Sequence, residues 1–379
     1  MTAALMPTYA PAPVTFVRGS GTELWDANGK RYLDFLCGLA VTSLGHANPA
    51  VAKAVTDQAA TLLHVSNLFR TEIGPEVAST LDRLIGGGGQ VFFCNSGAEA
   101  NECAIKLSRL AGGPGRHVVV SAFGSFHGRT LATLHATGQP AKHEKFQPLP
   151  EGFRHVAFGD VADLERALDP SVTAVLLEVV QGEGGVNVVP DEYMRAVRAL
   201  CTERGVLLIV DEVQTGLGRT GEWFGFQHVS IRPDIVTMAK ALGNGVPIGA
   251  CWATQDLAAL FEPGDHGTTY GGQPLAAAAA RATLRELEEI DAPRRARELG
   301  DRLCTGLSGV PSVAAVRGLG LLLAAELRDG RAKEAATALL DAGLVVNAVT
   351  PTALRFAPPL TATFDEIDEA VAVCTRVLT

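Results

Sequence analysis

Three short polar stretches carry residue types that could do chemistry, and each follows an apolar run. Ser96 and Glu99 form the S-x-x-E pattern that caps the start of a helix, where free N–H groups suit a phosphate. Asp211 follows four apolar residues, and Lys240 follows a second such run. A carboxylate or an amine in apolar surroundings needs a partner or a shifted pKa. These stretches are therefore the candidate site.

Each stretch also has a purely structural explanation. Ser96 and Glu99 could cap an ordinary helix, an arginine or backbone amides could neutralise Asp211, and a strand-end lysine commonly extends to solvent. Taken together, the three stretches favour pyridoxal phosphate. That cofactor needs a helix start for its phosphate, a carboxylate for its pyridinium nitrogen and a lysine for its aldehyde.

The elements that position these residues are predicted from apolar runs without alternation, which are typical of strands buried on both faces. The predicted strands are residues 91–93, 118–120, 172–177, 206–210, 235–238 and 248–252, with crossover helices at 99–110 and 192–204. The fold class is therefore α/β, with a mostly parallel central sheet and flanking helices. In such sheets ligands bind outside the carboxyl ends of the strands, where the polar stretches lie.

Three regions are predicted. Residues 1–55, with a hairpin at 23–32, form an N-terminal segment that packs with a small domain. Residues 56–273 form the large cofactor-binding domain. Residues 274–379 form a smaller α+β domain, with a helix at 274–289, strands at 316–325 and 344–349, and a closing helix capped by Thr363 and Glu366.

Composition limits the class of protein. The 379 residues include 32 Lys and Arg against 41 Asp and Glu, so the net charge of −9 disfavours nucleic acid and anionic lipid as partners. The 7 cysteines are scattered without a CxxC pair, so we expect reduced thiols, no metal and a cytoplasmic location. We find no export signal and no membrane span.

Read in full, the polar stretches resemble those of class III aminotransferases, the fold-type I pyridoxal-phosphate enzymes. The similarity covers nearly the whole chain and rests on NSGAEANE, SFHGRT, DEVQTGLGRTG, AKALGNGVPIG and HGTTYGGQPLA. It implies that Lys240 and Asp211 are catalytic, as the cofactor's lysine and the partner of its ring nitrogen. The implied cofactor-binding residues are Ser96, Gly97, Ala98, Phe126, Asp211, Gln214, Lys240 and Thr269. Thr269 resembles a threonine that reaches the neighbouring subunit's phosphate, which implies a homodimer.

The resemblance also implies how substrates bind. Tyr9 and Arg129 resemble a pair that holds the substrate carboxylate far from the reacting amine, and Arg355 and Glu183 resemble a switchable pair that accommodates a second carboxylate. Within the family the chain is most similar to bacterial members that act on N2-acetylornithine and 2-oxoglutarate in arginine biosynthesis. Other donors remain open: succinyl-diaminopimelate, ornithine or 4-aminobutyrate. Asn244 departs from the family pattern, in which glycine is frequent at that position.

One short glycine pattern suggests a second class of function. Residues 216–221 match GxGxxG, which hints at an NAD-dependent dehydrogenase. However, five residues separate this pattern from the preceding strand, and residues 222–225 do not read as the start of a helix. His127 is expected to brace its loop rather than to act as an acid or base.

Overall fold

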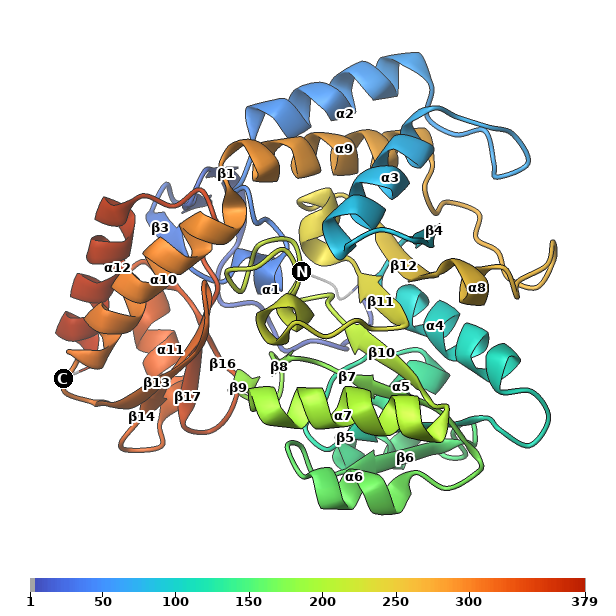
Figure 1. Ribbon diagram of the computed structural model, residues 1–379. Helices are drawn as coiled ribbons and strands as arrows, with labels where there is room; N and C mark the ends of the chain where they lie inside the picture. Colours follow the sequence, from blue (N-terminus) through green and yellow to red (C-terminus); the bar gives the residue numbers. More distant parts are fainter. Residues whose placement is uncertain (1–3, 379) are drawn as a thin grey trace.

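The centre of the molecule is a seven-stranded mixed sheet (Figure 1). The computed structural model describes residues 4–378. In spatial order the strands are β4 (Gly89–Cys94), β12 (Gly249–Thr254), β11 (Ile235–Met238), β10 (Leu207–Asp211), β7 (Val172–Leu177), β5 (Val118–Ala122) and β6 (Phe153–Val156). Six strands of this sheet run in one direction, and β12 runs opposite to them. The predicted α/β class and all six predicted strands are confirmed, whereas β6 was not predicted.

Helices cover both faces of this sheet, because adjacent residues of each strand point to opposite sides. Val119, Leu176 and Ile209 belong to the apolar cluster that α4, α5 and α8 share, and their neighbours along the strands belong to the cluster under α3, α6 and α7. The bounds are α3 (Ile73–Ile85), α4 (Gly97–Gly112), α5 (Leu131–Ala136), α6 (Val161–Ala167), α7 (Asp191–Arg204) and α8 (Gln255–Ala258). Burial on both faces therefore explains the uninterrupted apolar runs.

The C-terminal region begins with the long helix α9 (Pro274–Glu289) and contains a second, antiparallel sheet. Its elements are α10 (Ala292–Ser308), β13 (Val313–Leu319), β14 (Leu322–Leu327), α11 (Ala332–Asp341), β16 (Asn347–Ala348), β17 (Ala353–Phe356) and α12 (Phe364–Val377). The capping box of α12 is confirmed, since Thr363 Oγ1 accepts from the Glu366 amide at 3.2 Å and Glu366 Oε2 accepts from the Thr363 amide at 2.7 Å.

Two predicted C-terminal strands were wrong in their extent. Residues 316–325 contain the end of β13, a turn and most of β14. Residues 344–349 contain two short strands of different sheets: β15 (Leu344–Val345) and β16. The apolar pattern continues across both breaks because each strand is buried against the same core.

The N-terminal segment is joined to this region by backbone pairing. The expected hairpin is formed by β2 (Glu23–Asp26) and β3 (Arg31–Asp34), with β1 (Phe16–Ser20) beside β2. Strand β15 pairs in parallel with β3, and Leu33 donates to the carbonyl of Gly343 at 2.8 Å. Helix α2 (Pro49–Thr61) packs along α9.

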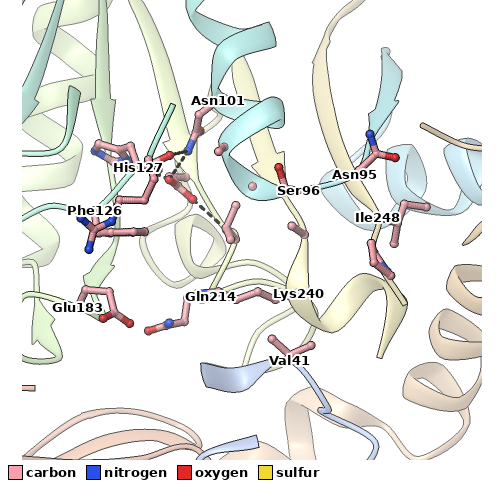
Figure 2. A pocket seen from close by; sticks show the side chains of 18 of the residues that line it. Val41, Asn95, Ser96, Asn101, Phe126, His127, Glu183, Gln214, Lys240 and Ile248 are labelled. Carbon is pink, nitrogen blue, oxygen red and sulfur yellow. Dashed lines mark hydrogen bonds and ion pairs between the residues drawn. The ribbon is translucent and has the colours of Figure 1, made fainter. Parts of the chain in front are cut away.

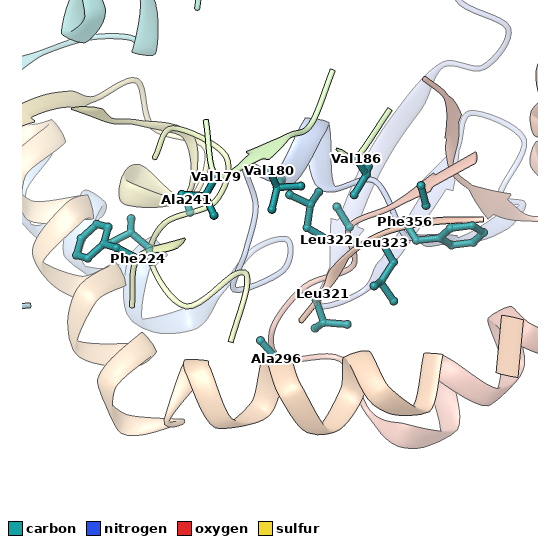
Figure 3. Close-up of a cluster of buried hydrophobic side chains, with 14 of the residues drawn as sticks. Val179, Val180, Val186, Phe224, Ala241, Ala296, Leu321, Leu322, Leu323 and Phe356 are labelled. Carbon is teal, nitrogen blue, oxygen red and sulfur yellow. The ribbon is translucent and has the colours of Figure 1, made fainter. Parts of the chain in front are cut away.

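One apolar core runs through all of these parts. Figure 3 shows Val180, Val186 and Phe224 in the same cluster as Leu322 and Phe356 of the C-terminal region. The remaining short strands are β8 (Val180–Gln181) and β9 (Asn187–Val188). They lie where the large sheet meets the C-terminal region, which we call the junction. Among the helices of residues 4–378, none combines the length and apolarity that crossing a bilayer requires.

The glycine pattern at 216–221 lies in this junction rather than at a dinucleotide site. Residues 216–224 form turns and bends, and no helix begins within them. Arg219 is fully buried and donates to the carbonyls of Leu321 and Pro358 and to Ser43 Oγ. The segment therefore joins three parts of the chain, which explains its glycines without a dehydrogenase.

Candidate active site

A cavity of about 370 Å³ opens beyond the carboxyl ends of β4, β10 and β11 (Figure 2). It contains most of the predicted site residues. Those that line it are Ser96, Gly97, Ala98, Phe126, Arg129, Glu183, Asp211, Gln214 and Lys240. The three polar stretches recognised in the sequence therefore meet at one edge of the sheet.

Asp211 ends β10 and is held by three donors. Its Oδ2 accepts from Asn101 Nδ2 at 2.8 Å and from His127 Nδ1 at 2.9 Å, and its Oδ1 accepts from the Val213 amide at 3.0 Å. Thr237 donates to Asn101 Oδ1 at 2.8 Å, which turns the amide nitrogen of Asn101 toward the carboxylate. Buried Asp211 thus has its partners among the described residues without an arginine.

The sequence did not predict Asn101 as a site residue, and for His127 it predicted only that the residue braces its loop. The His127 backbone does brace its loop, since its amide donates to Thr137 Oγ1 at 2.9 Å and its carbonyl accepts from Asn101 Nδ2 at 2.8 Å. Its side chain, however, contacts Asp211. A buried asparagine inside the apolar face of a helix was the signal that could have pointed to α4.

Lys240 also lines the cavity, at the start of the short 3-10 turn η4 (Lys240–Gly243) that follows β11, and Figure 2 shows it away from Asn101 and His127. Its backbone has a φ of 46°, in the left-handed region that non-glycine residues rarely occupy. Burial is the main cause that lowers the pKa of the Lys240 amine, and the nearby Glu183 carboxylate opposes it. A lowered amine pKa favours the neutral, nucleophilic form.

The start of α4 forms the third side. Ser96 Oγ accepts from the Glu99 amide at 3.2 Å, as expected, but the Glu99 carboxylate accepts from the Asn95 amide at 2.8 Å instead of completing the box at Ser96. A Cβ on Gly97 would lie 2.8 Å from a methyl group of Val213, so glycine lets the start of α4 approach the turn that follows β10 this closely. First-turn amides of a helix attract anions.

Two further side chains shape the cavity near Phe126. Glu178 accepts from the Phe126 amide at 3.0 Å and lines the cavity, and the sequence interpretation did not find it. Burial, together with the nearby Asp211 charge, raises the pKa of Glu178 well above its usual range. The Arg129 guanidinium lies 5.4 Å from the centre of the Phe126 ring and is exposed.

The predicted pair of Arg355 and Glu183 is formed. Arg355 is fully buried, and its Nη1 donates to Glu183 at 2.6 Å and to Gln214 Oε1 at 3.2 Å. Burial opposes ionisation of Glu183, but the guanidinium outweighs it and lowers the pKa of that carboxyl. Nη2 of Arg355 is buried without a partner in the described chain, so one donor remains available.

Three predicted residues do not line the cavity: Arg355, which contacts the lining residues Glu183 and Gln214, and Tyr9 and Thr269, which lie farther away. Tyr9 is 90% exposed and does not line it, so the expected pairing of Tyr9 with Arg129 is absent from this structure. Thr269 is also exposed and outside the cavity, in a loop whose neighbouring Thr268 accepts from the Gly271 amide.

The arrangement fits pyridoxal phosphate. It offers helix amides for an anionic group, Asp211 for a ring nitrogen, Lys240 for an aldehyde and the apolar surfaces of Phe126 and Val213 for an aromatic ring. The described residues contain no group of three or more His, Cys, Asp or Glu placed to hold a metal ion.

Comparison with known proteins gives the same answer from sequence. The model of the family "Aminotransferase class-III" matches residues 5–378. The acetylornithine aminotransferase of Corynebacterium efficiens is 49% identical over 99% of this chain and 94% of its own length. That of Caldanaerobacter subterraneus is 46% identical over 99% of this chain and 97% of its own.

Solved structures agree in fold. The ornithine aminotransferase of Toxoplasma gondii has a TM-score of 0.94 at 34% identity, covering 99% of this chain and 92% of its own. The acetylornithine aminotransferase of Elizabethkingia anophelis has a TM-score of 0.88 at 30% identity, covering 98% of this chain and 95% of its own.

Proposed function

This chain belongs to the class III aminotransferase family, whose cofactor is pyridoxal phosphate, and we propose that it transfers the terminal amino group of N2-acetylornithine to 2-oxoglutarate. The products are N-acetylglutamate 5-semialdehyde and glutamate, and the reaction is a step of arginine biosynthesis. The observation that carries the chemistry is that Lys240, Asp211 and the start of α4 line one cavity. Relatives called acetylornithine aminotransferases, at 46% to 49% identity over nearly the whole chain, support the donor.

The roles proposed for the inner residues follow from their contacts. When bound, pyridoxal phosphate supplies an electron sink for the negative charge that develops on the substrate carbon. Asp211, fixed by Asn101 and His127, holds a proton on the cofactor's ring nitrogen. The Lys240 amine would remove the proton from the substrate carbon that bears the reacting nitrogen and would deliver it to the carbon of the cofactor's aldehyde group.

The outer residues would bind the substrate carboxylates. Arg129 and Tyr9 hold the carboxylate of N-acetylornithine far from the reacting amine, and Tyr9 reaches it only if the N-terminal segment changes position. Glu183 neutralises Arg355 while this donor is bound. When 2-oxoglutarate or glutamate enters, Arg355 turns to its second carboxylate, for which a guanidinium fork is suited.

A homodimer would complete the cofactor site. Thr269 is exposed in its own chain, and it lies next in sequence to Tyr270, which is 67% exposed. Leu68 and Phe69 are 86% and 71% exposed, and an apolar surface of this kind suits a second copy. We infer that Thr269 reaches the phosphate held by the partner subunit.

Three further proposals complete this picture. The domain boundaries are 1–55, 56–273 and 274–379. The location is cytoplasmic, supported by seven free cysteines, and the net charge of −9 argues against a nucleic-acid partner.

Single-turnover reaction with different donors tests the function. N-acetylornithine, ornithine, 4-aminobutyrate and succinyl-diaminopimelate are each mixed with the cofactor-loaded protein, and the change in the cofactor's visible absorbance is followed. We expect N-acetylornithine to react with the highest kcat/KM. If another donor exceeds it by about tenfold, or about 1.4 kcal/mol of transition-state binding, the assigned donor is wrong while the class stands.

A further inference from the structure

Asn244 ends the turn that carries Lys240. The turn η4 begins with Lys240 at a φ of 46° and is capped by Asn244 at a φ of 45° and a ψ of 42°, so both ends are left-handed. Within the turn the backbone forms only short-range hydrogen bonds, from Leu242 to Ala239 at 3.0 Å and from Asn244 to Ala241 at 3.2 Å. A turn of this kind needs support from outside to hold one position.

The Asn244 side chain supplies such support from the distant N-terminal segment. Its Oδ1 accepts from the Leu44 amide at 2.8 Å, and its Nδ2 donates to the Gly45 carbonyl at 3.2 Å. One planar amide thus satisfies a donor and an acceptor of adjacent residues, about 200 positions away in sequence. We call this pair of hydrogen bonds the Asn244 clasp.

The segment that contains Leu44 and Gly45, residues 34–46, is itself fixed by hydrogen bonds. It contains α1 (Cys37–Ala40), a left-handed turn in which Cys37, Leu39 and Ala40 have φ values of 53°, 71° and 62°. Asp34 fixes its start, because Asp34 Oδ1 accepts from the Leu36 and Cys37 amides. The turn leads directly to Val41, which lines the cavity.

The far end of the segment is anchored as well. His46 Nε2 lies 2.7 Å from Asp34 Oδ2, and Arg219 donates to Ser43 Oγ at 2.8 Å. Gly45 admits no side chain, since a Cβ there would lie 2.7 Å from the Gly21 carbonyl oxygen. Residues 34–46 therefore form a rigid wall, and the clasp ties the lysine turn to it.

We propose that Asn244 is a positioning residue, which holds Lys240 at a fixed distance from the cavity wall at Val41. The inference rests on the proposed role of Lys240. Glycine is the residue that most readily adopts the left-handed conformation, so backbone geometry alone does not require asparagine here. What asparagine adds is the clasp. Its loss releases the end of the turn from Leu44 and Gly45 while Leu242 stays packed in the core, and we expect the Lys240 amine to be misaligned for proton transfer.

The variant Asn244→Gly tests this proposal, because it keeps the left-handed backbone without strain and removes both hydrogen bonds. We expect kcat to fall about tenfold while KM changes less than about twofold, the pattern of an interaction that acts on the chemical step. Independently of activity, amide exchange at Leu44 becomes about tenfold faster in the cofactor-free protein, since that amide loses its acceptor.

Two further variants isolate the clasp. Ser230→Gly makes a matched change, because Ser230 has a φ of 55°, is exposed and lies outside the cavity, so kcat and Leu44 exchange stay unchanged. Asn244→Asp keeps the acceptor for Leu44 and loses the donor to Gly45. Leu44 therefore stays more protected in this variant than in Asn244→Gly.

Borohydride reduction of each cofactor-loaded protein separates the possible failures. If Asn244→Gly leaves both kcat and Leu44 exchange unchanged, and the cofactor is fixed to Lys240 as in the unmodified protein, the positioning role of Asn244 is wrong. The proposed function then still stands. A fall in kcat without faster Leu44 exchange also overturns it. A cofactor that is never fixed to Lys240 in the unmodified protein overturns the proposed function and the clasp together.

Discussion

The inner and outer ends of the cavity are built in different ways. At the inner end, Asp211 and its partners Asn101 and His127 are buried, and the carboxylate accepts three hydrogen bonds from the described residues. At the outer end, Arg129 is exposed and Tyr9 and Thr269 lie away from the cavity. The groups proposed for the chemistry are thus already in place, whereas the roles proposed for Tyr9 and Thr269 require parts that lie apart from the cavity in this structure.

The largest expected effect is at the inner end. Asp211→Asn removes the negative charge while keeping the shape of the side chain, so a proton on the ring nitrogen is no longer stabilised. We expect kcat to fall on the order of 10³-fold, equivalent to about 4 kcal/mol in the barrier. Steady-state kinetics measure this, with circular dichroism as the control for folding. A loss smaller than about tenfold would contradict the role of Asp211.

Arg129→Gln tests the outer end. If Arg129 binds a carboxylate far from the reacting amine, its loss weakens binding without changing the chemical step. KM for N-acetylornithine should rise about tenfold, the value of one charge-assisted hydrogen bond, while kcat changes less than about threefold. Arg129→Lys, which keeps the charge, should recover part of the loss. An equal fall in kcat with unchanged KM would place Arg129 in the chemistry instead.

Thr269→Val has a smaller expected effect and tests whether this threonine binds the phosphate of a cofactor held by the partner subunit. Removing one hydroxyl from the phosphate site should raise the Kd for pyridoxal phosphate about fivefold, or about 1 kcal/mol. Because Thr269 is exposed in its own chain, the melting temperature of the cofactor-free protein should not change. Thr268→Val is the contrasting control, since its hydroxyl binds within the chain, to Asn95 and the Gly271 amide. Unchanged cofactor affinity in Thr269→Val refutes the cross-subunit role.

The smallest effect is expected at Glu178, a second inner carboxyl. Burial and the Asp211 charge raise its pKa, which favours the neutral carboxyl, and the Glu178→Gln substitution imitates that neutral form. We expect kcat/KM to change less than about threefold. A change as large as that of Asp211→Asn would show that Glu178 acts as an anion.

Glu178→Gln should also change how the melting temperature of the protein depends on pH. A carboxyl whose folded-state pKa is raised contributes stability at low pH, and this contribution is lost as the pH rises through the folded-state pKa. The charged groups that face Glu178 are Asp211, Lys240 and Glu183. Glu178→Gln removes the loss, so its melting temperature should gain on that of the unmodified protein as the pH rises above the ordinary carboxyl pKa of 4.5 toward the raised folded-state value. A constant difference across this range would contradict the raised pKa.

The residues at the inner end of the cavity could be predicted from the sequence more directly than those at the outer end. Apolar runs located the strands of the large sheet, and the rule that ligands bind beyond strand ends identified Asp211 and Lys240. Asn101 and His127 were missed as partners of Asp211 because their contacts span 110 and 84 positions of sequence. The left-handed turn at Cys37–Ala40 opposes local backbone preference, so no local pattern predicts it.

The outer residues were identified only through family resemblance. Nothing in the local sequence around Tyr9 or Thr269 marks a binding residue, and their proposed roles require a change in position of the N-terminal segment and a second copy of the chain. Burial cannot identify them in the single chain, because both are exposed there. Their roles therefore remain predictions, tested by the kinetics above.

The most direct measurement asks which lysine carries the cofactor. The protein is loaded with pyridoxal phosphate, reduced with borohydride and digested, and its peptides are analysed by mass spectrometry. We expect one modified peptide, with the added mass on Lys240. A modified peptide at another lysine, such as Lys142, or no modified peptide at all, would contradict it.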